Sequence, residues 1–73
     1  MDATIYRLLR WARAKAEHDG VSLGSISKSI SYDSRFLDRL ANGRGANVRS
    51  IEKAMSRLRA LGHFDGRGWS KTF

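Results

Sequence analysis

Four polar side chains between positions 34 and 39 have the clearest capacity for chemistry. Phe36, Leu37 and Leu40 repeat at helical spacing and must share one inward face. This phase leaves four side chains pointing outward, namely Ser34, Arg35, Asp38 and Arg39. The planar guanidinium of an arginine can donate two parallel hydrogen bonds to O6 and N7 of guanine. The outward group is therefore a candidate surface for contacting the bases of double-stranded DNA.

Arg35 is the best candidate for such direct base contact, because it stands near the start of the expected helix. Ser34 could reach a base or a phosphate, and Arg39 lies one turn further along. Asp38 follows Arg35 by three residues, so it could orient the guanidinium or accept a hydrogen bond from a cytosine amine. The alternative is that Arg35 and Asp38 form an ordinary surface ion pair, which would contribute little.

Two short helices between Ser22 and Gly43 must position these side chains. Ser22 is a good N-cap for the first helix. The apolar stripe of that helix consists of Leu23, Ile26 and Ile30. Asp33 is the expected N-cap of the second helix, 34–42, and Gly43 is its expected C′ residue. Two apolar stripes this close together can bury each other only if the helices cross, which is the helix-turn-helix arrangement.

The stretch 26–43 resembles the helix-turn-helix of lambda-repressor/Cro-like regulators. The positions that carry the resemblance are Ile30, Tyr32, Asp33, Leu37, Leu40, Gly43 and Arg44. Two positions depart from the family pattern: Ser31 stands where the family usually has Gly, and Ser27 where it usually has Ala. The resemblance extends over about residues 5–61, and it implies a dimer that binds a palindromic DNA site.

Phosphate contacts need hydrogen-bond donors around this motif. The free N–H groups at the start of the helix after Ser22 suit an anionic oxygen. The candidate contact residues are Ser22, Lys28, Asn42, Arg44 and Asn47. Of these, Asn42 and Arg44 match positions that lie along the DNA backbone in the resembled family. Asn42 could also cap a helix C-terminus and Asn47 a helix N-terminus, and neither role excludes a phosphate contact.

Composition favours a polyanionic partner. The 73 residues carry 14 Lys and Arg against 7 Asp and Glu, a formal net charge of +7. Such an excess of basic charge fits nucleic acid, although it could also serve solubility alone. The length suits one domain. No segment is apolar enough to span a bilayer or to act as a signal peptide, so we expect a cytoplasmic protein.

Two longer helices flank the motif. The first runs from a cap at Asp2 to about His18 and ends at Gly20. Its predicted core stripe is Ile5, Leu8, Leu9, Ala12 and Ala16. The last helix, 48–61, is capped by Asn47 and closed by Gly62. Its predicted stripe is Val48, Ile51, Ala54, Met55, Leu58 and Leu61.

The chain therefore divides into a DNA-binding domain, 1–62, and a C-terminal tail, 63–73. The tail shows no helical period, and we expect it to be irregular with at most a short extended piece. Its aromatic residues Phe64, Trp69 and Phe73 could anchor a dimer or another partner, or could cover the protein's own core.

Catalysis has little support in the sequence. The chain lacks cysteine, and His18 and His63 are isolated. His63 and Asp65 would supply only two metal ligands. No catalytic triad or phosphate-cradling glycine loop is present. We therefore expect no enzyme activity, no metal, no cofactor and no small-molecule ligand.

A membrane-bound helix is a further alternative, because Arg7, Arg10 and Arg13 form a basic stripe near Tyr6 and Trp11. A solvated face explains the stripe more simply. RNA binding is weaker still, because no stacking platform on a sheet is evident.

The sequence thus predicts a small all-α domain of four helices with a lambda-repressor-like helix-turn-helix. Its expected function is that of a transcriptional regulator, more specifically a repressor, acting as a homodimer on double-stranded DNA. The alternative is a protein-interaction module with the same fold, such as an antitoxin.

Overall fold

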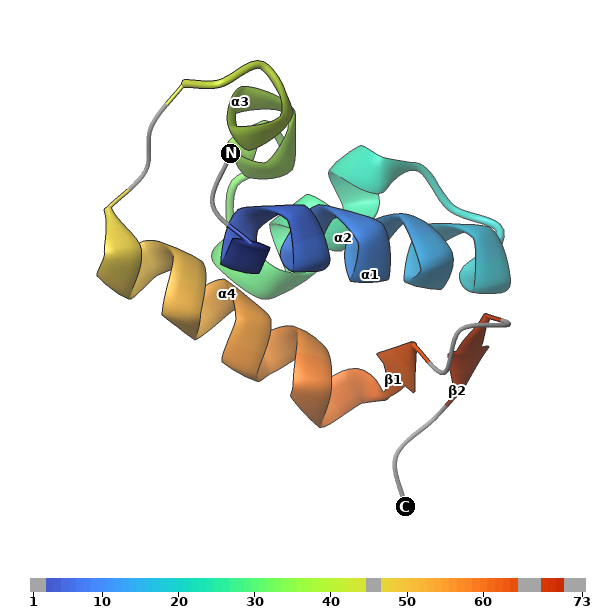
Figure 1. The fold of residues 1–73 in the computed structure, drawn as a ribbon. Coiled ribbons are helices and arrows are strands. Elements are labelled where there is room, and N and C mark those ends of the chain that lie inside the picture. Colours follow the sequence, from blue (N-terminus) through green and yellow to red (C-terminus); the bar gives the residue numbers. More distant parts are fainter. Residues whose placement is uncertain (1–2, 45–46, 65–67, 71–73) are drawn as a thin grey trace.

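The computed structural model describes residues 3–44, 47–64 and 68–70. In this part of the chain four helices account for most of the structure, so the predicted all-α class is confirmed. The helices are α1 (Ala3–Asp19), α2 (Leu23–Ser31), α3 (Phe36–Ala41) and α4 (Val48–Leu61). Two short strands follow, β1 (His63–Phe64) and β2 (Trp69–Ser70). Figure 1 shows α2 and α4 packed along α1, with α3 at one end of the group.

Local hydrogen bonds set where α2 and α4 begin. Ser22 Oγ accepts the backbone N–H of Ser25 at 3.2 Å, and Asn47 Oδ1 accepts that of Ser50 at 2.8 Å. Each bond satisfies an N–H that has no partner within its helix. Both predicted N-caps are therefore confirmed, whereas the predicted cap at Asp2 lies outside the described residues.

Gly43 ends α3 in the predicted way. Its φ is +75°, a conformation that favours glycine. The N–H of Gly43 donates to the carbonyl of Leu40 at 3.1 Å, and the N–H of Arg44 donates to that of Arg39 at 2.9 Å. This pair of bonds is a Schellman motif, and it fixes the direction in which the chain leaves α3.

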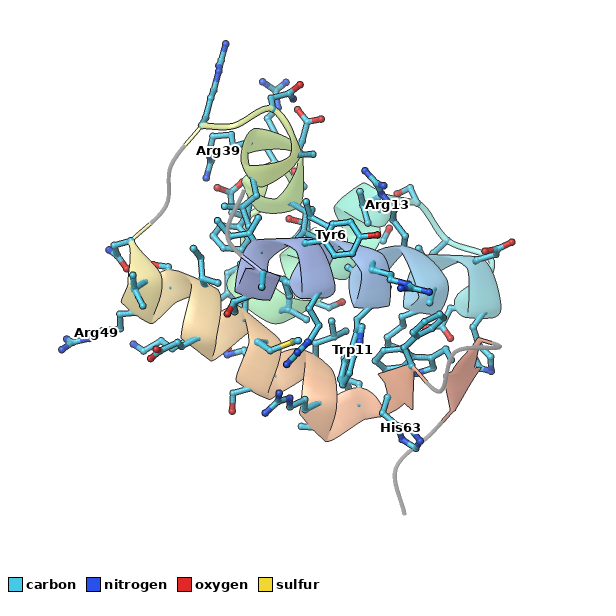
Figure 2. The ribbon with its side chains drawn as sticks, viewed as in Figure 1. Tyr6, Trp11, Arg13, Arg39, Arg49 and His63 are labelled. Carbon is cyan, nitrogen blue, oxygen red and sulfur yellow. The ribbon has the colours of Figure 1, made fainter. Side chains whose placement is uncertain are left out.

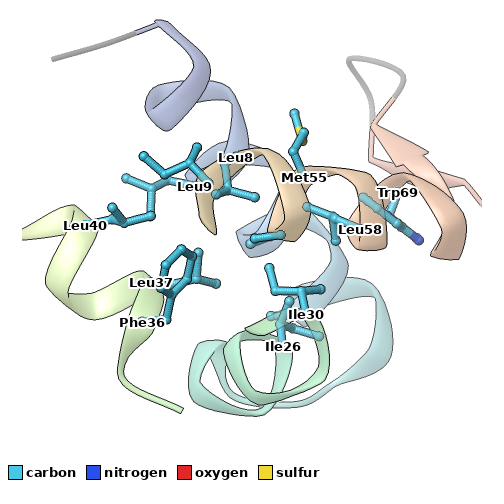
Figure 3. Close-up of a cluster of buried hydrophobic side chains, with 14 residues drawn as sticks. Leu8, Leu9, Ile26, Ile30, Phe36, Leu37, Leu40, Met55, Leu58 and Trp69 are labelled. Carbon is cyan, nitrogen blue, oxygen red and sulfur yellow. The ribbon is translucent and has the colours of Figure 1, made fainter. Parts of the chain in front are cut away.

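All four helices contribute to one hydrophobic core (Figure 3). Leu8, Ile30, Leu37 and Leu58 are the largest fully buried apolar side chains, one from each helix. The remaining buried apolar residues are Leu9, Ala12, Ala16, Ile26, Phe36, Leu40, Ile51, Ala54, Met55 and Trp69.

The predicted stripes are correct in phase and too long at their ends. Val48 is 69% exposed and Leu61 42% exposed. They are the first and last residues of α4. Ile5 and Leu23 are only partly buried against the core.

The segment after α4 is more ordered than predicted. Strands β1 and β2 pair antiparallel, with Phe64 opposite Trp69. Trp69 is 6% exposed, and its ring meets that of Trp11 edge-on at 6.3 Å between centroids. The short extended piece that the sequence allowed is therefore present as these two paired strands, and the indole of Trp69 packs onto α1. Trp69 covers the chain's own core and is not free to anchor a partner, while Phe73 lies outside the described residues.

Candidate nucleic-acid interface

Ser27 joins α2 to the start of α3. Its side chain is fully buried, and its hydroxyl donates to the carbonyl of Asp33 at 2.6 Å. The same oxygen accepts the backbone N–H of Leu37 at 3.1 Å. Leu37 lies in the first turn of α3, where N–H groups lack an intrahelical partner. Sequence reasoning noted Ser27 only as a departure from alanine and missed this bridge.

Tyr32 forms the turn between the two helices in an unusual conformation. Its φ is +61°, which is rare for a bulky residue, and its side chain is 78% exposed. In the resemblance to the lambda-repressor/Cro-like motif, Ser31 stands at the family's glycine position. The residue with the left-handed backbone conformation in this turn is Tyr32 instead. Ser31 is the last residue of α2, a position that does not require glycine, and its hydroxyl donates to the carbonyl of Ser27 at 2.6 Å.

Arg57 of α4 supports this turn. One of its terminal nitrogens, Nη1, donates to the carbonyl of Ile30 at 3.1 Å. The guanidinium carbon lies 4.6 Å from the centroid of the Tyr32 ring, within the range of a cation–π contact. A basic side chain of α4 is thereby held against the end of α2.

The second helix of the motif begins later than predicted. The sequence predicted 34–42 with Asp33 as N-cap, whereas α3 spans Phe36–Ala41 and Arg35 is its N-cap residue. The Asp33 carboxylate still accepts a backbone hydrogen bond, from the N–H of Arg35 at 2.9 Å. This bond closes a tight turn through Ser34 immediately before α3.

The candidate base-contacting residues are all exposed, but they do not form a single group. Ser34, Arg35 and Asp38 line a shallow hollow of about 250 Å³ beside the start of α2. Arg39 lies on the other side of α3, where Nη2 pairs with the carboxylate of Asp33.

No ion pair joins Arg35 to Asp38, both of which belong to the described residues. The alternative in which these two side chains form an ordinary surface ion pair is therefore not observed, and Arg39 has the acidic partner instead. The N–H of Arg35, followed by the guanidinium of Arg39, holds the pKa of the Asp33 carboxyl below its ordinary value of 3.8.

The candidate phosphate-contacting residues either make capping bonds at helix ends or are exposed. Ser22 and Asn47 cap helices, and Asn42 donates from Nδ2 to the carbonyl of Asp38 at 2.8 Å. Lys28 and Arg44 are exposed. The capping roles anticipated for Asn47 and Asn42 are thus present, and they hold these side chains in fixed positions.

Basic side chains also lie over the aromatic rings of the opposite side. The guanidinium carbon of Arg10 is 4.9 Å from the Phe64 ring centroid, and Lys15 Nζ is 5.5 Å from that of Trp69. Figure 2 shows Tyr6 and Arg13 on one side of α1, where a hollow of about 530 Å³ opens toward Ala41 at the end of α3. Basic side chains therefore lie on α1 as well as around the α2–α3 turn, so positive charge does not by itself define one binding face.

Comparisons with known proteins do not decide between the functions considered. No protein-family model, curated protein or solved structure matches the chain. Within the described residues, no three His, Cys, Asp or Glu side chains gather as metal ligands would. No helix in the described ranges has the length and apolar character needed to cross a membrane.

Proposed function

We propose that this protein is a sequence-specific DNA-binding transcriptional regulator, with α2 and α3 acting as a helix-turn-helix. The observation that carries the proposal is the bridge at Ser27, which fixes α3 against α2 and leaves Ser34, Arg35 and Asp38 together on an exposed hollow. A net charge of +7 supports attraction to a polyanion. The resemblance of 26–43 to lambda-repressor/Cro-like motifs supports the same function.

In this proposal Arg35 contacts a base and Arg44 contacts the phosphate backbone. Arg35 is preferred over Arg39 for base contact, because Arg39 would first have to leave Asp33. Arg44 follows the glycine that ends α3, beyond the residues that a helix in the major groove presents to bases. The protein acts as a repressor and binds as a homodimer, which places two recognition helices about 34 Å apart on a palindromic site.

The test begins with selection of bound fragments from genomic DNA, in which we expect a palindrome. Affinities are then measured on the selected site and on random duplex. Arg35→Ala should cost about 1–3 kcal/mol on the selected site and much less on random DNA. Arg44→Ala should weaken both similarly and lower the slope of log affinity against log salt by about one.

Two results would contradict the proposal. Absence of binding at low salt would remove DNA as the partner and favour the protein-interaction module. Equal losses on both duplexes for Arg35→Ala would make Arg35 a phosphate contact and move base contact to another residue of the hollow. The interaction module has less support in the structure, since Trp69 is buried.

A further inference from the structure

A second cleft, of about 260 Å³, lies between the α2–α3 turn and α4. The proposed base-contacting hollow lies on the other side of α3 and does not use it. Three basic residues line this cleft, Arg39, Lys53 and Arg57, together with one acidic residue, Asp33. The cleft therefore has a net positive charge, and its apolar walls at Ile30 and Phe36 strengthen the electrostatic field inside it.

Lys53 and Arg57 repel each other electrostatically, and a bound anion would offset this repulsion. They stand four residues apart on α4, where like charges repel. Lys53 makes no hydrogen bond or ion pair with any residue of the described ranges, and Glu52 lines a different hollow. No carboxylate of α4 compensates the two charges in this cleft.

Arg57 is already oriented for an anion. The carbonyl of Ile30 uses Nη1 and the ring of Tyr32 covers the guanidinium face, while a guanidinium has five N–H donors in total. Stacking of this kind leaves donors at the edge of the group available. It also gives the strained conformation of Tyr32 a purpose, because a glycine there would remove the ring that holds Arg57.

We propose that this cleft binds a phosphate group through Lys53 and Arg57, with Arg39 shared between the phosphate and Asp33. Ser50 lies one turn before Lys53 on the same wall and supplies a hydroxyl. A water occupies about 30 Å³, so the cleft has room for a phosphate group and several waters. The phosphate group belongs either to the DNA backbone, in which case this inference rests on the proposed function, or to a free phosphorylated molecule.

The first experiment needs no DNA. Inorganic phosphate is titrated into isotope-labelled protein at constant ionic strength, with chloride as the reference, and backbone amide shifts are followed by NMR. We expect saturable shifts at the amides of Ser50, Lys53 and Arg57. Lys53→Gln should weaken phosphate binding about tenfold, as expected for the loss of one charge-assisted hydrogen bond.

Arg49→Gln is the matched control, because it removes one charge from the same helix. Arg49 is exposed and points away from the rest of the molecule (Figure 2). Its substitution should leave phosphate affinity unchanged. Tyr32→Gly keeps the left-handed turn and removes the ring, so it should weaken phosphate binding several-fold without lowering the thermal midpoint. Unchanged phosphate affinity in Tyr32→Gly would overturn the positioning role of Tyr32.

The second experiment identifies the source of the phosphate. If it belongs to DNA, Lys53→Gln lowers the salt slope of DNA binding by about 0.9 and Arg49→Gln does not. If phosphate binds and the slope is unchanged, the ligand is a free phosphorylated molecule. Phosphate binding by a protein that binds no DNA at all would likewise indicate a free phosphorylated ligand, although the proposed function would then be wrong. The inference is overturned if inorganic phosphate gives no saturable shifts at the amides of Ser50, Lys53 and Arg57, or if Lys53→Gln binds phosphate as tightly as the parent protein does. A slope that falls equally in Lys53→Gln and Arg49→Gln would exclude the DNA backbone as the source of the phosphate.

Discussion

Replacement of Ser27 by alanine tests the element on which the proposed interface depends. The substitution removes a hydroxyl that no solvent reaches, and it leaves the N–H of Leu37 without its bond. Water cannot replace the lost partner, since both residues are fully buried. The carbonyl of Asp33 suffers less, because it also accepts the N–H of Phe36 at 3.2 Å and the hydroxyl of Ser31 at 3.1 Å.

The expected magnitude follows from this difference between the two partners. One orphaned buried N–H costs about 1–3 kcal/mol. Alanine recovers about 0.5 kcal/mol through its better helix propensity. The net loss should be about 0.5–2.5 kcal/mol, out of about 4–11 kcal/mol for a domain of this length. For a small domain this corresponds to a fall of about 2–20 °C in the thermal midpoint.

Thermal and urea unfolding, followed by circular dichroism, measure this loss. Ser29→Ala is the matched control, because Ser29 is an exposed serine of α2 whose hydroxyl donates to the carbonyl of Ser25 at 3.1 Å. Its substitution should change the free energy of unfolding by less than about 0.5 kcal/mol. If Ser27→Ala unfolds like Ser29→Ala, the bridge does not stabilise the α2–α3 unit and the reasoning fails.

Two further predictions concern the core and the turn. Leu37→Ala should destabilise the domain by about 2–5 kcal/mol, because the side chain is fully buried. The control Leu61→Ala, at a 42% exposed position, should cost much less stability. Similar thermal midpoints for the two variants would refute the inward phase assigned to Leu37 in α3. Asp33 has a lowered pKa in the folded state, so its ionised form contributes stability above pH 3.8 that is lost as pH falls through the lower folded pKa. Asp33→Asn should therefore be less stable than the parent at pH 7, and urea midpoints should converge as the pH falls below 3.8. A constant difference down to pH 2.5 would contradict the lowered pKa of the Asp33 carboxyl, which the N–H of Arg35 and then the guanidinium of Arg39 cause.

The sequence predicted those parts of the fold that depend on short-range rules. The caps at Ser22 and Asn47 and the glycine at 43 act within three residues of their own positions. The helical spacing of the apolar residues of α3 predicted that Leu37 faces inward, and Leu37 is buried together with Phe36 and Leu40. These features could be read from the chain without knowledge of its tertiary structure.

The site was harder to predict, because its bonds join residues at other separations. Spacing suggested a pair between Arg35 and Asp38, three residues apart, whereas the actual pair joins Arg39 to Asp33 across six residues and a turn. The start of α3 differs from the predicted start at residue 34 for the same reason, because one carboxylate oxygen of Asp33 accepts the N–H of Arg35 in the turn. Such bonds depend on the path of the turn, which no residue spacing specifies.

Trp69 illustrates a different limit. An aromatic residue in a short polar segment can cover its own core or meet a partner, and both outcomes have the same local sequence. Its burial depends on Trp11 and Lys15 of α1, more than fifty residues earlier in the chain. The helix that receives the indole was predicted, whereas the sequence left open whether the chain returns to that helix or meets a partner.

The serines of α2 show how this chain holds a weak helix in place. Serine favours caps and turns over helix interiors, so α2 has little stability of its own. Ser29 and Ser31 donate back to carbonyls one turn earlier, and Ser31 also bonds the carbonyl of Asp33 in the turn that follows α2. Only Ser27, at the buried position, reaches α3. The orientation of the exposed hollow therefore depends on one hydroxyl as well as on apolar packing, because an alanine at the same position would bury as well and leave the first turn of α3 without that partner.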